Sequence, residues 1–404
     1  MARRAFIYSI ALLTSVTTGS ASADTTLQQP LRDGYQEPFE AVLEITNHDY
    51  STYTTTIAVG DPPQNFTAII DTTWSDAWLP SVDCPQRSHQ FVCDAHPLYN
   101  GTASRTYVRS NQSVALNNSG FWTSGRKAAD TYHIRPLQAS GQSFVEASDV
   151  RPSFFFHHTW YDTVLPLARI TSPVNIFSNL SASSVFQNLQ AQGNLARNVI
   201  SIRLPPTEHE VGELCLGGVD PDFANGNDIA RRLPMVKGPP DPGYISTRWI
   251  AGGWYVEPIS VTLEAEPNPV SFNLSGHVAV LNVAEPYILL PDDFVRAMHT
   301  RLGSNSMELP CNRTAGLPDL TFRLRGEAGQ VHSFTLHGED YLRAEPQVPF
   351  TAPGICNIFA TAYSRLPDNT PPFIVLGSLF LRKFHTVFDA DEMLVSFTCP
   401  ACIS

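Results

Sequence analysis

The chain has 404 residues, with 26 lysines and arginines against 38 aspartates and glutamates, which gives a formal net charge of −12. Hydrophobic residues make up 43% of the sequence, which excludes a disordered chain, and charged residues make up only 16%, which argues against coiled coils. The 32 prolines and 24 glycines favour many turns and few long helices. The acidic balance offers no basic footprint for nucleic acid.

The first 23 residues have the pattern of a secretory signal peptide. Arg3 and Arg4 precede an apolar stretch over residues 5–13, and small residues over 20–23 form a cleavage site after Ala23. The apolar stretch is shorter than the roughly 20 residues that span a bilayer. We therefore expect a secreted, extracellular product without a membrane anchor. Residues 24–48 follow as a short N-terminal segment.

Export makes glycans and disulfides plausible. Seven cysteines leave at least one without a partner in the chain. Cys84 and Cys93 are expected to close a short loop, and Cys311 and Cys356 a longer one, whereas Cys215 has the strand context of a buried core thiol. For Cys399 and Cys402, which have the spacing of a redox motif, a local disulfide in the tail is favoured over redox chemistry, and the pairing of Cys215, Cys399 and Cys402 is left open. Seven Asn-x-Ser/Thr sequons are candidate glycosylation sites, at Asn65, Asn100, Asn111, Asn117, Asn179, Asn273 and Asn312.

Short strands separated by turns dominate the pattern along the chain. Residues 54–59 and 66–70 are rich in β-branched and apolar residues, and both runs are predicted to be strands. A helix is predicted over 184–190, with a stop at Gly193, and another over 292–302, which starts after a proline and ends at a glycine. Residues 239–242 contain three prolines and are the candidate hinge between two halves.

An internal repeat is the most informative feature. Asp71 ends an apolar run and is followed nine residues later by a proline, and Asn282 has the same context. Residues 164–166 and 375–377 form a second matched pair of apolar triplets, each ending 95 residues after its Asp71 or Asn282. Two lobes built on this plan would place the Asp71 and Asn282 side chains facing each other.

These motifs resemble the pepsin-like family of aspartic proteases. The ordered matches include the segments 53–66, 71–81, 161–165, 212–220, 373–382 and 387–389. The resemblance implies an all-β, bilobal pepsin-like fold: two β-barrel lobes related by a pseudo-two-fold axis, with a central cleft. The N-terminal lobe would span 49–238 and carry Asp71, and the C-terminal lobe would span 239–404 and carry Asn282. It further implies a monomer that takes a peptide, a protein or a small molecule in the cleft.

The chemistry of the family requires two carboxylates that share one proton and one water. Asp71 is similar to the first of them, but Asn282 stands at the second position, and an amide cannot exchange a proton in this way. Thr72, Thr73 and Trp74 are predicted to line the cleft; the last two replace a glycine and a serine of the family. Asn118 occupies the position at which the flap of the family normally carries a tyrosine.

Several departures therefore accumulate around one site. Residues 283–286 replace the small and hydroxyl residues that follow the second acid in the family, and Pro166 replaces a glycine. Glu285 is a possible surrogate acid, although a solvated turn residue is the favoured interpretation. The sequence contains no spaced ligand set for a metal and no cofactor fingerprint, so neither is expected.

Three functions remain open from the sequence. The first is an impaired or inactive protease homologue that binds a ligand in the cleft. The second is an active aspartic endopeptidase with an unorthodox pair of acids. The third is a non-proteolytic catalyst or helper that acts on a secreted small metabolite, with Asp71 as a lone acid or base.

Overall fold

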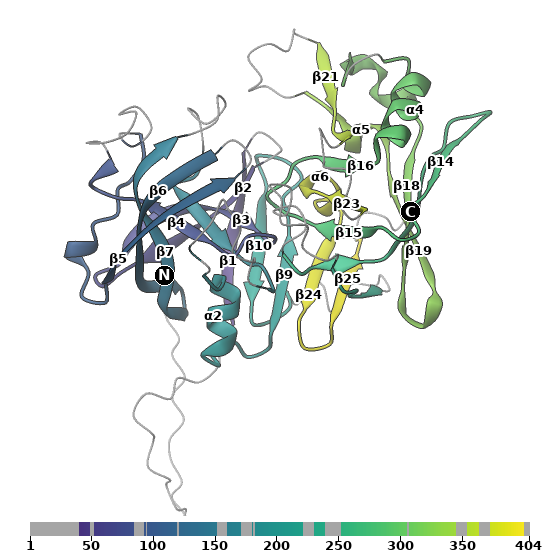
Figure 1. Cartoon of the computed structure of the whole chain (residues 1–404). Helices are drawn as coiled ribbons and strands as arrows, with labels where there is room; N and C mark the ends of the chain where they lie inside the picture. The colour runs from purple at the N-terminus through teal and green to yellow at the C-terminus, as the bar shows by residue number, and fades with distance from the viewer. Residues whose placement is uncertain are drawn as a thin grey trace, which may run out of the picture. The chain divides into compact units, whose positions relative to one another are not determined.

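The computed structural model describes residues 40–48, 52–84, 93, 95–118, 121–151, 160–170, 180, 182–220, 230–238, 252–304, 307–344, 354–362 and 372–399. The predicted signal peptide, the candidate hinge and the sequon at Asn179 lie outside these residues. Pro38–Ser404 forms one unit by its internal contacts. Strands predominate in it and helices are few and short (Figure 1), which confirms the predicted all-β class.

The largest sheet contains 13 strands. Ten of them follow the order β11-β25-β24-β9-β10-β1-β2-β6-β7-β4, while β3 pairs with β2 and β8, and β5 pairs with β6. Their bounds are β1 Ala41–His48, β2 Thr52–Val59, β3 Gln64–Asp71, β4 Ala77–Pro80, β5 Val108–Asn118, β6 Phe121–Ile134, β7 Leu137–Arg151, β8 Thr163–Pro166, β9 Val199–Arg203, β10 Val211–Leu216, β11 Arg231–Pro234, β24 His385–Asp389 and β25 Leu394–Thr398.

The described strands from β12 to β23 form three smaller sheets. Their orders are β12-β15-β23-β16-β22, β14-β13-β18-β19 and β17-β21-β20. The bounds are β12 Tyr255–Val256, β13 Pro258–Leu263, β14 Val270–Asn273, β15 Val278–Leu281, β16 Ile288–Leu290, β17 Glu308–Pro310, β18 Leu320–Arg325, β19 Val331–Leu336, β20 Leu342–Arg343, β21 Ile355–Ile358, β22 Ala360–Ala362 and β23 Phe373–Leu376.

Both predicted helices are confirmed. Helix α2 (Val185–Ala191) begins at a capping box formed by Ser184 and Gln187, and helix α4 (Asp292–Leu302) ends at Gly303, whose φ of 69° is left-handed. The other helical elements of the described residues are short: α5 Gly338–Tyr341, α6 Ser378–Leu381, and the 3-10 helices η2 Gly101–Ala103, η5 Cys311–Gly316 and η6 Glu327–Gly329.

The internal repeat predicted from the sequence appears as matched strand pairs. Strand β3 pairs in parallel with β8, with Ile70 opposite Leu165. Strand β15 pairs in parallel with β23, with Leu281 opposite Leu376 in the corresponding register. All four residues of β8, and all four of β23, are buried, as expected for parallel strands covered on both faces. Each half therefore presents its polar residue, Asp71 or Asn282, at the end of a buried parallel pair.

The described strands form no closed barrel, so the β-barrel form predicted for the two lobes stays a prediction. The largest sheet also contains strands from the end of the chain: β24 pairs with β9, and β25 pairs with β24 and β11 (Figure 1). The two halves therefore share a sheet on this side, and the lobe boundary at 238/239 stays a prediction.

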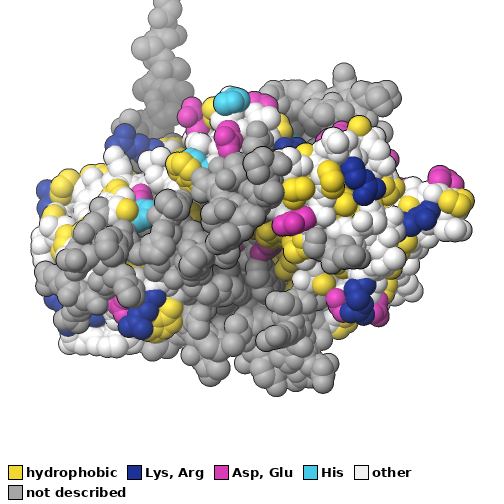
Figure 2. Space-filling model, turned by 90° about the horizontal axis from the view of Figure 1, so that it is seen from above, with side chains coloured by type: hydrophobic (Ala, Val, Ile, Leu, Met, Phe, Trp, Pro, Cys, Tyr) yellow, Lys and Arg dark blue, Asp and Glu magenta, His cyan; other side chains and the backbone are white. Residues whose placement is uncertain are grey.

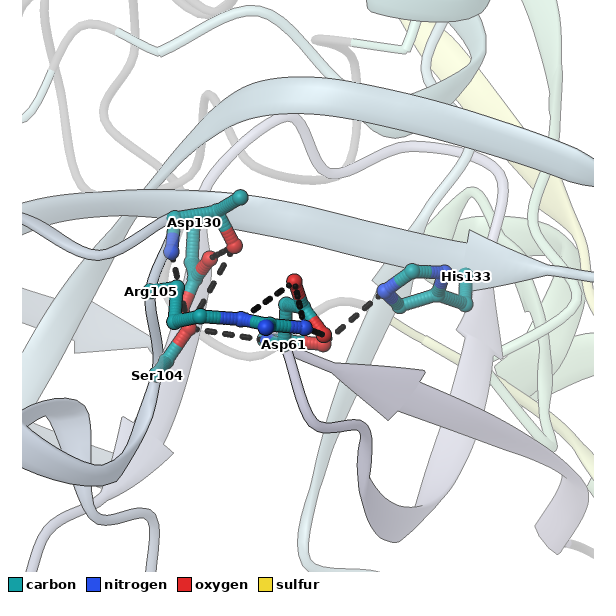
Figure 3. A network of polar contacts seen from close by, with 7 residues as sticks. Asp61, Ser104, Arg105, Asp130 and His133 are labelled. Atoms are coloured by element: carbon teal, nitrogen blue, oxygen red, sulfur yellow. Dashed lines mark hydrogen bonds and ion pairs between the residues drawn. The ribbon is translucent and has the colours of Figure 1, made fainter.

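A polar network stiffens the first half (Figure 3). Arg105 donates two hydrogen bonds to the Asp61 carboxylate, at 2.9 and 2.8 Å, and the Ser104 hydroxyl accepts the Asp61 N–H. The hydrogen bond from Arg105 holds the pKa of Asp61 below its usual range. The His133 ring lies 2.9 Å from the Gly60 carbonyl oxygen, so the turn after β2 is attached to β6.

Asp130 is the buried centre of the same network. Its side chain is fully buried, and its carboxylate accepts hydrogen bonds from the Tyr99 hydroxyl at 2.6 Å, the Thr106 hydroxyl and the Thr131 N–H. A buried carboxylate is tolerated when several donors satisfy it. Asp130 therefore holds β6, the second strand of the β5–β6 hairpin, against Tyr99 and Thr106, which precede β5.

Candidate active site

Asp71 lies at the end of β3 and is 2% exposed. Its Oδ1 accepts three hydrogen bonds from the loop that follows: the Thr73 N–H and hydroxyl, both at 2.8 Å, and the Trp74 N–H at 3.1 Å. This arrangement orients the carboxylate rigidly. The role of Asp71 as the retained acid of the pair stays a prediction.

Asn282 occupies the corresponding place in the second half, directly after β15. Its side chain is fully buried and its Oδ1 accepts the Ala284 N–H at 2.9 Å, which repeats the Asp71–Thr73 bond two residues along the chain. Because Oδ1 takes this N–H, the amide nitrogen occupies the other position. That nitrogen, Nδ2, has no hydrogen-bond partner.

Thr72 joins the two halves beside these side chains. Its hydroxyl donates to the Leu281 carbonyl oxygen at 2.9 Å and accepts the Val283 N–H at 3.2 Å. Leu281 and Val283 flank Asn282, so the Asp71 and Asn282 loops are in direct contact through Thr72. The matching residue of the second loop is Val283, which has no hydroxyl, and the link is therefore made from one side only.

Residues 252–254, for which the sequence predicts no role, close the same junction. The Trp254 indole N–H donates to the Leu167 carbonyl oxygen at 3.1 Å, and the Trp254 carbonyl oxygen accepts the Leu281 N–H at 3.2 Å. A Cβ on Gly252 would lie only 2.5 Å from the Thr73 Cα, so the backbone passes directly over that loop. The paired glycines before a tryptophan are the sequence signal for such a close approach.

Trp74 is packed away from solvent. It is 4% exposed and belongs to a hydrophobic cluster that also contains Trp78, Val114 and Leu116, the last two from β5. The position that carries a small hydroxyl residue in the resembled family here carries an indole that fills space beneath the β5–β6 hairpin. Thr73, fully buried, supplies its hydroxyl to Asp71 instead.

Glu285 differs from the sequence-based expectation. A solvated turn residue was favoured, but Glu285 is only 7% exposed, and its Oε1 accepts the Tyr287 N–H at 3.1 Å. The reason is the backbone: the Ser378 N–H donates to the Glu285 carbonyl oxygen at 2.6 Å, and Gly377 packs against the same turn. Ser378, which was not predicted, is fully buried, and its hydroxyl has no partner.

Asn118 and the predicted sequons occupy edges and turns. Backbone pairing places Asn118 opposite Phe121, at the closed end of the β5–β6 hairpin, where a flap residue is expected. Among the described sequon side chains, Asn65, Asn111, Asn273 and Asn312 are exposed and Asn100 is half-buried. Occupancy by sugar stays a prediction.

The cysteines pair as the sequence suggested. Cys84 is bonded to Cys93, and Cys311 to Cys356. Cys399 is also disulfide-bonded, and its expected partner, Cys402, lies outside the described residues. Cys215 is free and buried, and burial raises the pKa of its thiol to about 12. Its predicted position as a buried core thiol is confirmed.

The junction of the two halves thus holds one carboxylate and one amide in matched loops. A carboxylate can accept a proton and hold a water, whereas an amide can only donate or accept hydrogen bonds. One positioned acid or base is typically worth about 10²–10⁴ in rate, so the second position decides whether this arrangement hydrolyses a peptide bond.

Comparisons with known proteins agree with this architecture. The model of the eukaryotic aspartyl protease family matches residues 52–399. The chain is 28% identical to cathepsin D of Gallus gallus over 373 residues, covering 89% of this chain and 83% of that protein. It is 26% identical to renin of Canis lupus familiaris over 359 residues, covering 87% and 80%. Within the described part of the chain, no helix has the length and apolar character needed to cross a membrane. The chain belongs to the eukaryotic aspartyl protease family, and its fold is the all-β, two-lobed fold of pepsin.

Proposed function

We propose that this chain is a secreted member of its family that binds a peptide, a protein or a small molecule over Asp71 and Asn282 without hydrolysing it. One observation carries the proposal: the second loop holds an amide, with Oδ1 of Asn282 bonded to the Ala284 N–H and Nδ2 buried without a partner. A buried N–H donor without an acceptor is costly, so a ligand carbonyl or carboxylate is its natural partner.

Neighbouring residues support the same proposal. Hydrolysis needs a water placed within about 3 Å of both groups, and displacement by about 1 Å can cost ~10²-fold in rate. Pro166 stands opposite Asp71 in the β3–β8 pair, and Val283 lacks the hydroxyl that Thr72 supplies on the other side. Trp74 packs beneath the hairpin. Together with Pro166 and Val283 it makes the Asp71 loop and the Asn282 loop differ from the matched loops that would hold a symmetric pair of acids.

Secretion rests on the sequence alone. The N-terminal pattern is that of a signal peptide, and the exposed sequons and the disulfides fit an exported chain. Expression of the full chain in a secreting eukaryotic cell tests this part: N-terminal sequencing of the medium is expected to begin at Asp24, and retention of residues 1–23 would contradict it.

The activity test uses the secreted full chain and a generic peptide library, with cleavage detected by mass spectrometry from pH 3 to 7. We expect no cleavage by the wild type and little recovery in Asn282→Asp, because the surrounding loops stay altered. Asn194→Asp, the same amide-to-acid change after α2, is the matched control. Full rescue by Asn282→Asp alone would show that only one residue separates this chain from an active enzyme.

An active endopeptidase with an unorthodox pair of acids is the second candidate, and the burial of Glu285 favours it. In that case the wild type would cleave peptides, and both Asp71→Ala and Glu285→Gln would abolish cleavage. Cleavage lost in Asp71→Ala but kept in Glu285→Gln would point to another partner acid. Either form of wild-type cleavage refutes the non-hydrolytic proposal.

A further inference from the structure

A small polar cavity lies where strands β5, β6 and β7 meet the loop that follows β4. Its volume is about 20 Å³, which is enough for one water molecule or one small ion. Neither Asp71 nor Asn282 lines it, so the cavity is separate from the candidate active site. All of its lining residues are polar: Ser81, Asp83, Arg109, Arg126, Glu146 and Ser148.

The strand register explains why the charged residues of this cavity meet. Arg126 on β6 stands opposite Glu146 on β7. Arg109 on β5 stands opposite Ala128, which lies two residues after Arg126 on the same strand. Directly opposite residues, and residues two apart on one strand, share a face of a sheet. Arg109, Arg126 and Glu146 therefore project from the same face.

The two guanidinium groups lie near one hydroxyl and are uncommitted. Burial and Glu146 raise the pKa of the Tyr107 hydroxyl. The charges of Arg109 and Arg126 both act against this rise, so both lie close enough to Tyr107 to influence it. Within the described residues, neither guanidinium makes a hydrogen bond or an ion pair. Each therefore offers N–H donors that no described acceptor uses.

Two serine hydroxyls add further donors. Ser81 is 1% exposed, and its Oγ accepts the Asp83 N–H at 3.3 Å, while no described residue accepts its own O–H. The Ser81 backbone is held in place because its N–H donates to the Ala147 carbonyl oxygen at 2.9 Å. Ser148 is half-buried, and its hydroxyl makes no hydrogen bond in the described part of the chain. An occupant that accepts hydrogen bonds would satisfy these donors.

Two carboxylates share the lining and balance the two guanidinium groups in formal charge. Glu146 Oε2 accepts the Tyr107 O–H at 2.6 Å, so one of its oxygens is already engaged. Asp83 is exposed, and solvent and salt screen its charge. The described residues show no ion pair between either acid and Arg109 or Arg126. The attraction for an anion therefore comes from short-range hydrogen bonds rather than from a net positive charge.

From these contacts we propose that the cavity binds a single chloride ion between Arg109 and Arg126. Chloride accepts hydrogen bonds and donates none, so it matches the surplus of donors, and hydrogen bonds from charged donors are the strong kind. The small volume excludes an organic anion. The site is local, since the whole chain carries −12 and the charged side chains on the face in Figure 2 are dispersed among neutral ones. It is independent of the proposed function.

The test is a titration of the secreted full chain with sodium chloride, followed by the line width of the chloride NMR signal, with sodium gluconate keeping the ionic strength constant. We expect saturable binding with a dissociation constant on the order of 1–10 mM. Arg109→Gln and Arg126→Gln should each weaken it by about tenfold, because each removes charged donors. Arg323→Gln on β18, exposed and outside the cavity, is the matched control and should leave it unchanged.

A charge variant of the opposite sign makes the test sharper. Asp83→Asn removes a negative charge beside the cavity and keeps the backbone N–H that Ser81 accepts, so chloride should bind about two- to fivefold more tightly. Weaker binding in Asp83→Asn would contradict the proposal. Asp83, Arg109 and Arg126 are all exposed, so these variants are expected to fold, and circular dichroism checks this.

Several other results would overturn the proposal. They are chloride signals that do not saturate, and chloride binding that Arg109→Gln and Arg126→Gln both leave unchanged. A crystal soaked in sodium bromide gives a second measurement, because bromide can replace chloride and is located by its anomalous scattering. We expect a bromide between Arg109 and Arg126. A water in that place, or bromide bound equally at exposed arginines such as Arg323, refutes the site.

Discussion

The Thr72 hydroxyl provides the sharpest test of how the two halves are joined. It donates to the Leu281 carbonyl oxygen and accepts the Val283 N–H, and its side chain is fully buried. Thr72→Val keeps nearly the same volume but leaves both backbone groups without this partner. A buried unsatisfied polar group costs about 1–3 kcal/mol, so we expect a loss of roughly 2–4 kcal/mol in the free energy of unfolding. This is a large part of the ~5–15 kcal/mol of a typical domain.

Urea titrations read by tryptophan fluorescence measure this loss, and hydrogen exchange at the Val283 amide locates it. Thr72→Ser is the control: it keeps the hydroxyl and removes one methyl group, at a cost of about 1 kcal/mol. By the internal repeat, Val283→Thr would direct a hydroxyl to the Ile70 carbonyl oxygen, and we expect a gain of about 0.5–1.5 kcal/mol. A Thr72→Val change below about 0.5 kcal/mol, with Val283 still protected from exchange, would refute the role of this hydroxyl.

Three further predictions concern stability and reactivity. Burial and Asp130 raise the pKa of Tyr99, so above pH ~10 the unfolded chain releases a proton that the folded chain keeps, and stability falls as the pH rises. Tyr99→Phe should reduce this slope by up to ~1.4 kcal/mol per pH unit in urea titrations from pH 9 to 11; an unchanged slope would contradict it. Replacing Cys311 and Cys356 by serine opens a disulfide across a separation of 45 residues and should cost ~4 kcal/mol, and a cost near zero in the same assay would exclude it. Cys215, buried and with a raised pKa, should resist iodoacetamide at pH 8 in the native protein and react in urea, as mass spectrometry would show; rapid native labelling would mean that it is accessible.

The sequence alone determined the features that depend on local pattern and spacing. Helix α4 follows from the periodic burial of Phe294, Val295, Met298 and Leu302 between a proline and a glycine. The repeated apolar run and triplet identified Asp71 and Asn282 as equivalent, because equal spacings in two halves build equal parallel pairs. These inferences needed no knowledge of which distant strands meet.

Contacts between segments far apart in the chain could be recognised only from the fold itself. The pairing of β24 with β9, the Thr72 link to Leu281 and Val283, and the packing of Trp74 beneath β5 each join residues without a shared local signal. Glu285 is buried because Ser378 holds its backbone, although its turn sequence reads as solvated. The burial of such a side chain is set by the whole fold rather than by any one stretch of chain.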